Sequence, residues 1–265
     1  MNNIKLIKGD CLEKMDKLIE QGIKVDCVIT DIPYGTTNRN KWDIVIPFEP
    51  MWDKINKLTN DNGAILLFSD EPFTSQLICS NPKIFKQRIT WDKDRGAGFL
   101  NAKKMLLKQT EDICLFYKKP PTYNPQMVQA QADRIRPIST KSTESNNYGK
   151  VDKVQAGEDY NPELRYPTNL IKFSSMTGEC NNLNRLHPTQ KHIELIESLI
   201  KTYSNEDDTI LDFTMGSCST GVACIKTNRN FIGIELDNTY FGTCKNRVET
   251  YIKENNLQDV NIIMS

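Results

Sequence analysis

The sequence has few of the residues and patterns that would assign it at once to a metal-binding, secreted or membrane class. It contains only two histidines, and its eight cysteines form no C-x-x-C pair, so a structural zinc site is not expected. No apolar run approaches the ~20 residues that span a bilayer. The amino terminus reaches an acid at Asp10 before a signal-like apolar stretch can form. We therefore expect a cytoplasmic protein with reduced thiols, no metal and no membrane partner.

The chain also lacks net charge, because 34 Lys and Arg residues balance 34 Asp and Glu residues. The distribution is uneven. Residues 81–191 carry 19 basic and 11 acidic side chains, a surplus of eight that the rest of the chain offsets. A basic middle segment favours a polyanionic partner, but a solvated mixed-charge surface would give the same count.

Alternating strand and helix patterns occupy both ends of the chain. Buried, β-branched runs predict strands at residues 3–9, 25–30, 63–69, 209–213 and 231–236. Helical patterns between them predict a parallel sheet. Two further runs, at residues 85–91 and 113–118, predict antiparallel strands at its edge.

The segment from residue 119 to about residue 185 has a different character. It contains six prolines, many Asn, Gln and Ser residues, and little apolar periodicity. An irregular region of this length inside a compact domain is usually functional or disordered, so it is the natural place for a substrate-reading insert.

Residues 211–221, LDFTMGSCSTG, join a predicted strand to the start of a helix. Backbone N–H groups at such a helix start attract anionic or polar ligand groups. Glu235 follows Gly216 by 19 residues, close to the spacing at which an acid binds ribose hydroxyls in Rossmann-like sites. The loop is not G-x-G-x-x-G, and a tight turn without a ligand would show the same pattern.

The residues Asp31, Ile32, Pro33 and Tyr34 follow another predicted strand, at the sheet edge where α/β proteins place their ligands. The Asp31 carboxylate and the Pro33 carbonyl can accept the two protons of an exocyclic amine. Tyr34 offers an aromatic face on which a base can stack. A simple turn in which Tyr34 only packs is the alternative.

Two further residues, Asp10 and Lys191, are candidates for ligand binding. Asp10, at the end of the first strand, can accept from an adenine amino group or cap the following helix, and the cap is the better interpretation for that residue alone. Lys191 is predicted in the first turn of a helix, where a cation opposes the helix dipole.

Together these motifs resemble the β class of DNA amino-methyltransferases. Asp-Ile-Pro-Tyr resembles the D-P-P-Y catalytic motif, and His-Pro-Thr-Gln-Lys at residues 187–191 with Asp-Phe-Thr-Met-Gly-Ser at residues 212–217 resembles the S-adenosylmethionine half. The catalytic motif comes first, a variable region next and the cofactor motif last, as in that class. The resemblance covers residues 3–119 and 186–250.

The resemblance implies methyl transfer to adenine N6 in double-stranded DNA, with Asp31, Pro33 and Tyr34 as catalytic residues and the base flipped out of the duplex. It implies that Asp212 and Lys191 flank the methionine part of the cofactor. The implied cofactor-binding residues are Asp10, Cys11, Asp31, Ile32, His187, Thr189, Lys191, Asp212, Phe213, Thr214, Gly216, Ser217, Cys218, Ser219, Glu235 and Leu236. Candidate DNA-binding residues, chosen by residue type, are Lys93, Arg95, Arg134, Arg136 and Arg165.

The resemblance also implies a Rossmann-like fold with a circularly permuted, seven-stranded, mostly parallel sheet and an inserted target-recognition region. The expected division is a catalytic half at residues 1–118, the insert at 119–185, a cofactor half at 186–255 and a tail at 256–265. The permutation requires the carboxyl-terminal helix to lie near the first strand. A homodimer is expected by resemblance only.

Two residues depart from the family pattern. Ile32 replaces the first proline of the catalytic motif, which should leave Asp31 and Pro33 in place. Cys218 replaces a glycine, so its side chain is expected to crowd the methionine end and its backbone to be strained if φ is positive. We expect slightly altered cofactor affinity rather than loss of binding.

Other functions remain open at this point. A cytosine-N4 methyltransferase is the nearest alternative, because Asp rather than Ser in the motif favours adenine only by association. A catalytically inactive DNA-binding protein on the same fold is kept open by Cys218. RNA and protein-glutamine methyltransferases use a related tetrapeptide, but the motif order and the basic insert argue against them. A restriction-modification, orphan or phage role would give the same sequence pattern.

Overall fold

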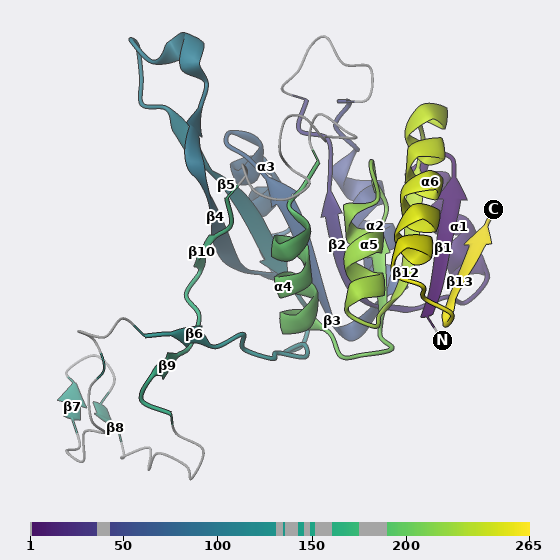
Figure 1. Ribbon diagram of the computed structural model, residues 1–265. Helices are drawn as coiled ribbons and strands as arrows, with labels where there is room; N and C mark the ends of the chain where they lie inside the picture. The colour runs from purple at the N-terminus through teal and green to yellow at the C-terminus, as the bar shows by residue number, and fades with distance from the viewer. Residues whose placement is uncertain are drawn as a thin grey trace. The chain divides into compact units, whose positions relative to one another are not determined.

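The computed structural model describes residues 2–35, 43–130, 135, 143–145, 149–151, 161–174 and 190–265 (Figure 1). Its elements in chain order are β1 (Asn2–Lys8), α1 (Cys11–Glu20), β2 (Val25–Asp31), α2 (Phe48–Leu58), β3 (Thr59–Ser69), α3 (Phe73–Ser80), β4 (Phe85–Ala97), η1 (Phe99–Asn101), β5 (Lys108–Phe116), β6 (Val128–Gln129), β7 (Thr143–Ser145), β8 (Gly149–Val151), β9 (Leu164–Arg165), β10 (Leu170–Lys172), α4 (Ile193–Tyr203), β11 (Thr209–Asp212), α5 (Ser219–Lys226), β12 (Asn230–Glu235), α6 (Asn238–Glu254) and β13 (Val260–Met264).

One sheet organises the larger of two compact units, which comprises Met1–Asn124 and Asn169–Ser265. Its strand order is β10-β4-β5-β3-β2-β11-β12-β1-β13. Only β5 runs against its neighbours, pairing antiparallel with both β3 and β4. The predicted mostly parallel sheet is therefore confirmed. Among the described residues this sheet has nine strands rather than seven, because β10 and β13 extend the two edges.

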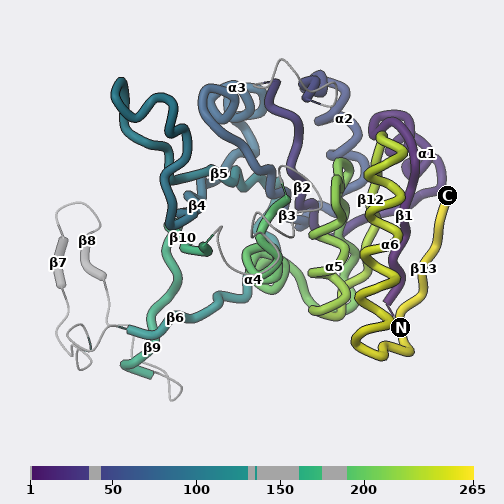
Figure 2. The backbone as a smooth tube through the Cα atoms, turned by 45° about the horizontal axis from the view of Figure 1, so that its top comes forward, coloured from purple at the N-terminus to yellow at the C-terminus, as the bar shows by residue number. Residues whose placement is uncertain are grey.

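Helices cover both faces of this sheet (Figures 1 and 2). One core cluster joins the sheet to α1, α2 and α3, and the other joins it to α4, α5 and α6. Strand β3 contributes side chains to both core clusters: Leu66 and Phe68 belong to one cluster, and Ile65 and Leu67 to the other. Successive side chains of a strand point to opposite faces, so a strand covered on both sides must be apolar throughout.

The ends of the chain agree with a circular permutation. Strand β1 pairs in parallel with β12 and, on its other side, with β13. Helix α6 packs against β1 and β12, as Figures 1 and 2 show. The prediction that the carboxyl-terminal helix lies beside the first strand is confirmed.

Helix α2 was not predicted from the sequence. Pro47 is its N-cap residue and Pro50 lies in its first turn, a position that tolerates proline because the N–H it lacks has no partner there. The buried face of α2 comprises Met51, Trp52, Ile55 and Leu58.

The smaller unit is Pro125–Thr168. Within it β6 pairs with β9, and β7 pairs with β8, each in antiparallel fashion. It is shorter than the predicted insert of residues 119–185, because residues on either side belong to the larger unit: Asn124 donates to the Thr202 carbonyl, and β10 joins the sheet. Its role in target recognition stays a prediction.

Candidate active site

The polar candidates lie at one edge of the sheet. Strands β1, β2, β11 and β12 are mutually parallel, so their carboxyl ends meet there. A cavity of about 830 Å³ opens at this edge, within the usual range of ~300–1,000 Å³ for small-molecule sites. The predicted site residues that line it are Asp10, Cys11, Asp31, Ile32, Pro33, Tyr34, Lys191, Asp212, Phe213, Thr214, Gly216, Ser217, Ser219, Glu235 and Leu236.

Asp212, at the end of β11, connects the two halves of the site. Its carboxylate accepts hydrogen bonds from the hydroxyls of Thr30 and Thr220, each at 2.7 Å. The Thr214 hydroxyl lies 2.6 Å from that of Thr30 and donates to the Asp31 carbonyl at 3.0 Å. Burial raises the pKa of Asp212 to about 6, against the hydrogen bonds that lower it. The loop after β11 is thereby fixed to the end of β2.

Glu235 and Asp10 occupy the ends of the next two strands. Glu235 accepts from the backbone N–H of Gly216 at 2.9 Å and of Asp237 at 2.7 Å, so the 19-residue spacing does bring its carboxylate to the glycine turn. Asp10 caps α1 through bonds from the Leu12 and Glu13 backbone, which confirms the cap interpretation. Both residues also line the cavity.

Cys218 differs from its neighbours in the same loop. It is in the left-handed conformation, with φ 62° and ψ 34°, so the strain foreseen for a non-glycine residue is present. Its side chain is fully buried and does not line the cavity, whereas Ser217 and Ser219 do. The expectation that the thiol crowds the cofactor is therefore not supported, because the side chain is packed in the core.

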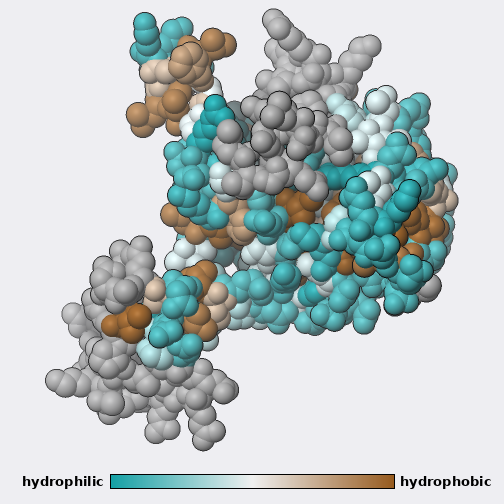
Figure 3. Space-filling view, in the orientation of Figure 1, coloured by the Kyte–Doolittle hydropathy of each residue, from teal (hydrophilic) through white to brown (hydrophobic). Residues whose placement is uncertain are grey.

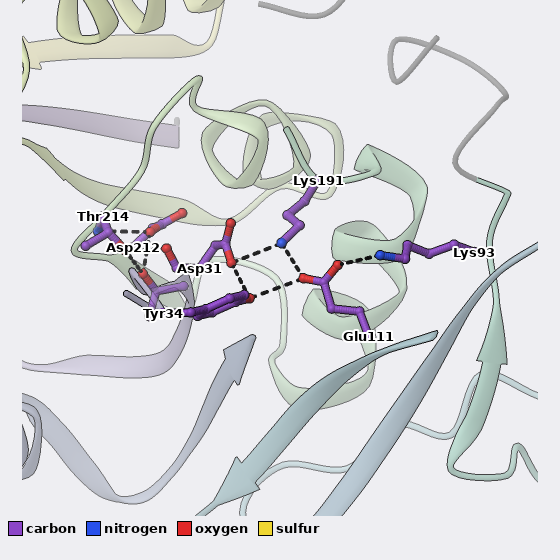
Figure 4. Close-up of polar contacts among 8 residues, drawn as sticks. Asp31, Tyr34, Lys93, Glu111, Lys191, Asp212 and Thr214 are labelled. Atoms are coloured by element: carbon purple, nitrogen blue, oxygen red, sulfur yellow. Dashed lines mark hydrogen bonds and ion pairs between the residues drawn. The ribbon is translucent and has the colours of Figure 1, made fainter. Parts of the chain in front are cut away.

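Asp31 is the centre of a buried polar network (Figure 4). The Tyr34 hydroxyl donates to Asp31 Oδ1 at 2.7 Å, and Lys191 Nζ lies 3.0 Å from the same oxygen. Lys191 Nζ also contacts Glu111 Oε1, and Glu111 Oε2 lies 3.2 Å from Lys93 Nζ. Both contacts of the Asp31 carboxylate with described side chains use Oδ1, which leaves Oδ2 available as an acceptor for a substrate.

The charges in this network set its protonation. Burial raises the pKa of Asp31, Lys191 opposes that rise, and the negative charge of Glu111 adds to it. Burial would raise the pKa of Glu111 too, but the two lysines outweigh it and lower that pKa. Burial would lower the pKa of Lys191, yet its two carboxylate partners raise it. Burial and the charge of Glu111 therefore favour the protonated form of Asp31, whereas the two lysines favour the ionised form of Glu111.

Glu111 and Lys93 were not recognised as parts of this network from the sequence. Glu111 is 8% exposed on β5, in register with Trp91 of the neighbouring strand. Its carboxylate contacts Lys191 and the Tyr34 hydroxyl, the two groups that also contact Asp31. Lys93 had been predicted to bind DNA, but its amine is held by Glu111. The sequence alone does not indicate this network, because the contact between Lys93 and Glu111 depends on the register in which β4 and β5 pair.

The other predicted residues are placed as follows. Lys191 lies before α4, which begins at Ile193, so its predicted position in the first helical turn is wrong; two carboxylates hold it there instead of the helix. Arg95 is exposed on β4, and Arg165 donates to the carbonyls of Pro162 and Leu164. His187, Thr189, Arg134 and Arg136 lie outside the described residues.

The chemistry of the cavity fits S-adenosylmethionine. Asp31 and Asp212 suit its cationic amino acid and sulfonium end, and Glu235 retains acceptor capacity for ribose hydroxyls. Gly216, at φ 51°, opens a turn whose backbone leads into the start of α5. In the described part of the chain, no group of three His, Cys, Asp or Glu residues could hold a metal, and no helix is both long and apolar enough to cross a membrane.

Comparison with known proteins agrees with this reading of the site. The family described as DNA methylase (N6_N4_Mtase) matches residues 25–246, and the chain belongs to this family. It is 30% identical over 257 residues to the type II methyltransferase M1.MboII of Moraxella bovis, covering 89% of this chain and 93% of the relative. It is 28% identical to the DNA adenine methyltransferase YhdJ of Escherichia coli, covering 89% of this chain and 79% of YhdJ.

Solved structures support the same fold. The complex of M1.HpyAVI with S-adenosylmethionine has a TM-score of 0.63 and 27% identity, covering 92% of this chain and 98% of the other. The cytosine-N4-specific PvuII methyltransferase has a TM-score of 0.61 at 14% identity, covering 98% and 95%, and shows the fold alone. The predicted Rossmann-like methyltransferase fold and DNA amino-methyltransferase family are confirmed, and S-adenosylmethionine fits as the cofactor.

Proposed function

We propose that this protein methylates the exocyclic N6 of adenine in double-stranded DNA, with S-adenosylmethionine as the methyl donor. The observation that carries the proposal is the Asp31 carboxylate at the cavity, with Oδ1 bound by Tyr34 and Lys191 and Oδ2 available to a substrate amine. The match to YhdJ, whose name specifies adenine, favours adenine over cytosine.

In this proposal Asp31 and the Pro33 carbonyl accept the two protons of the amine. Such an amine is a poor nucleophile because its lone pair is delocalised into the ring, and two acceptors favour the geometry in which that pair is localised. When bound, S-adenosylmethionine supplies a methyl group on a positively charged sulfur. The chain's own part would be to hold the amine at Asp31 and the Pro33 carbonyl, and to take up at Asp31 the proton that the nitrogen would lose on gaining the methyl group.

Reaching this pocket requires the base to leave the duplex. Tyr34 is prepared for stacking because its ring is held against Phe73, with centroids 5.3 Å apart and planes inclined by 29°, and its hydroxyl is bonded to Asp31. Alignment of nitrogen, methyl and sulfur would supply most of the remaining rate gain.

The test is mass spectrometry of nucleosides from plasmid DNA incubated with the protein and S-adenosylmethionine, with Asp31→Ala alongside. We expect N6-methyladenine with the unaltered protein and a loss of about 10²–10³-fold with the variant, because one catalytic hydrogen-bond group is removed. Thermal unfolding shows whether the variant still folds, because Asp31 also lines the cofactor cavity and its loss can weaken cofactor binding by itself.

The other outcomes are distinct. N4-methylcytosine would keep the mechanism and overturn the choice of base. Absence of any methyl transfer by a protein that binds DNA would support the inactive DNA-binding alternative. Target reading by residues 119–185, the homodimer and the cytoplasmic location stay predictions.

A further inference from the structure

The hairpin formed by β4 and β5 extends beyond the sheet at the edge that carries the cavity. Strand β5 is antiparallel to β3 and β4 is antiparallel to β5, so β4 runs in the same direction as β2 and β3. Its carboxyl end, and the turn of residues 98–107, therefore project from the same edge as Asp31. Figures 1 and 2 show this hairpin reaching away from the rest of the larger unit.

The tip of this hairpin, residues 95–108, combines apolar and basic side chains. Leu100 is 94% and Leu106 96% exposed, and Phe99 is 82% exposed. A cluster of large exposed apolar residues marks an interaction site rather than ordinary surface. The same segment contains Arg95, Lys103, Lys104 and Lys108 and no acidic residue. In Figure 3 the tip stands out as a mixture of apolar and hydrophilic atoms.

The tip is an ordered structure. Gly98, at φ 82°, turns the chain into η1, and backbone bonds join Asn101 to Gly98, Ala102 to Phe99 and Met105 to Asn101. The backbone of the tip then loses little conformational entropy when its side chains insert into a partner, which favours binding.

The base of the hairpin is part of the catalytic network. Lys93 of β4 and Glu111 of β5 are bound to each other, and Glu111 in turn contacts Lys191 and lies near the Tyr34 hydroxyl. The hairpin is thus held at Asp31 by its base and extends outward at its tip.

From this arrangement we infer that the hairpin tip inserts Phe99, Leu100 and Leu106 into the DNA duplex beside the target base, while Lys103 and Lys104 bind flanking phosphates. The inference rests on the proposed function. Apolar wedges of this kind unstack base steps, and a flipped base leaves an opening that apolar side chains can fill. The absence of acidic residues from the tip suits DNA and disfavours a second copy of this chain, since two such tips would bring like charges together.

The experiment compares two double variants of the tip with matched variants elsewhere. Leu100→Ser with Leu106→Ser removes the apolar contacts, and Lys103→Ser with Lys104→Ser removes the charges. The control for the apolar variant is Met264→Ser, on the opposite edge of the sheet. The control for the lysine variant is Lys245→Ser with Lys253→Ser, on α6. Thermal unfolding and cofactor titration identify any variant that fails to fold.

We expect the apolar variant to raise the KM for duplex DNA or to lower kcat by about tenfold, since it no longer fills the opening that the flipped base leaves in the stack. A duplex with a mismatched target base is easier to open, and it should restore most of the activity of this variant. The binding constant for DNA falls as salt concentration rises. In the lysine variant, the slope of the logarithm of this constant against the logarithm of salt concentration should be less steep by about 2. The control variants should match the unaltered protein in all three measurements.

Unchanged DNA kinetics and salt dependence in both tip variants would overturn the inference and leave the proposed function standing. A shift from dimer to monomer in sedimentation, with unchanged DNA kinetics, would assign the tip to contacts between copies and overturn it as well. If the unaltered protein transfers no methyl group, the proposed function fails. Fluorescence anisotropy with duplex DNA would then decide the inference: retained binding by both tip variants would overturn it, and loss of binding would support it.

Discussion

At the scale of single residues, Glu111 determines how Asp31 is presented to a substrate. It is buried, it contacts Lys191 and Lys93, and the Tyr34 hydroxyl lies 3.2 Å from its Oε1. Glu111 touches neither the expected cofactor nor the base in the proposed reaction. Its function is to hold Lys191 and Tyr34 where both can bind Asp31 Oδ1, which makes it a positioning residue.

Glu111→Gln should lower kcat by about tenfold or more, because charged hydrogen bonds are worth about 1.5–3 kcal/mol each. It should also shift the acidic limb of the pH–rate profile. Ionised Asp31 is the active form, and the charge of Glu111 raises the pKa of Asp31. Removal of that charge lowers this pKa, so the limb should move to lower pH. Initial rates of methyl transfer measured across pH test both effects.

Glu249→Gln is the matched control, because Glu249 is half-exposed on α6, where it pairs with Lys245 at 3.8 Å. A merely structural role for Glu111 would reduce the amount of folded enzyme and leave the position of the limb unchanged. A limb that stays in place, or moves to higher pH, contradicts the positioning role.

The sequence identified the residues of this site that lie next to a recognisable strand end, and it missed those that reach the site by strand pairing. Asp31, Asp212 and Glu235 each follow a buried run directly, so their place at the sheet edge could be predicted. Glu111 reaches the site because β5 pairs with β3 and β4 in one particular register. A single sequence carries no signal for that register.

At the scale of elements, the loop between β11 and α5 combines backbone strain with a buried side chain. Cys218 has a positive φ at which a glycine would be unstrained, and its thiol is packed in the core. The sequence predicted the strain correctly from the missing glycine. It could not show that the thiol points away from the cavity, because that depends on how α5 packs.

Replacement of Cys218 separates these two effects. Cys218→Ala keeps the left-handed strain and loses the thiol, whereas Cys218→Gly also relieves strain of about 1–2 kcal/mol. We therefore expect the glycine variant to be the more stable of the two by about 1 kcal/mol in chemical denaturation, after allowing for its more flexible unfolded chain. Both variants should bind S-adenosylmethionine within about twofold of the unaltered protein, since the side chain does not line the cavity.

A change in cofactor affinity of tenfold or more in either variant would show that the thiol shapes the cavity after all. An alanine variant as stable as the glycine variant would show that the left-handed backbone is not strained in solution.

Helix boundaries show the same limits of prediction. Apolar periodicity predicted α4 correctly but began it too early, because Lys191 belongs to the buried network instead of the first turn. Helix α2 was missed because prolines at its start hid a pattern whose buried residues do recur at helical spacing. In both cases the helix start, which depends on a few local contacts, was harder to predict than the sheet.

At the scale of the whole molecule, the two compact units divide the chain in a way that can be tested. The smaller unit leaves the larger after Asn124 and returns at Asn169. Both of these residues are bound within the larger unit: the Asn124 side chain donates to the carbonyls of Lys201 and Ser204, and that of Asn169 to the carbonyl of Arg88. The described residues that line the cavity and form the catalytic network all belong to the larger unit.

Excision of residues 125–168 should therefore leave a folded protein that binds S-adenosylmethionine. A Gly-Ser linker of about 15 residues, with a reach of up to ~50 Å, should join Asn124 to Asn169 without strain. Because both core clusters stay complete, we expect cofactor titration to give an affinity within about threefold of the full chain. Methylation of plasmid DNA should fall by at least ~10³-fold, since the predicted reader of bases is removed and specific binding typically exceeds non-specific binding by that factor or more. Retained methylation at the same sites, mapped by sequencing, would place target recognition in the larger unit and leave the β4–β5 hairpin as the principal candidate to read the DNA.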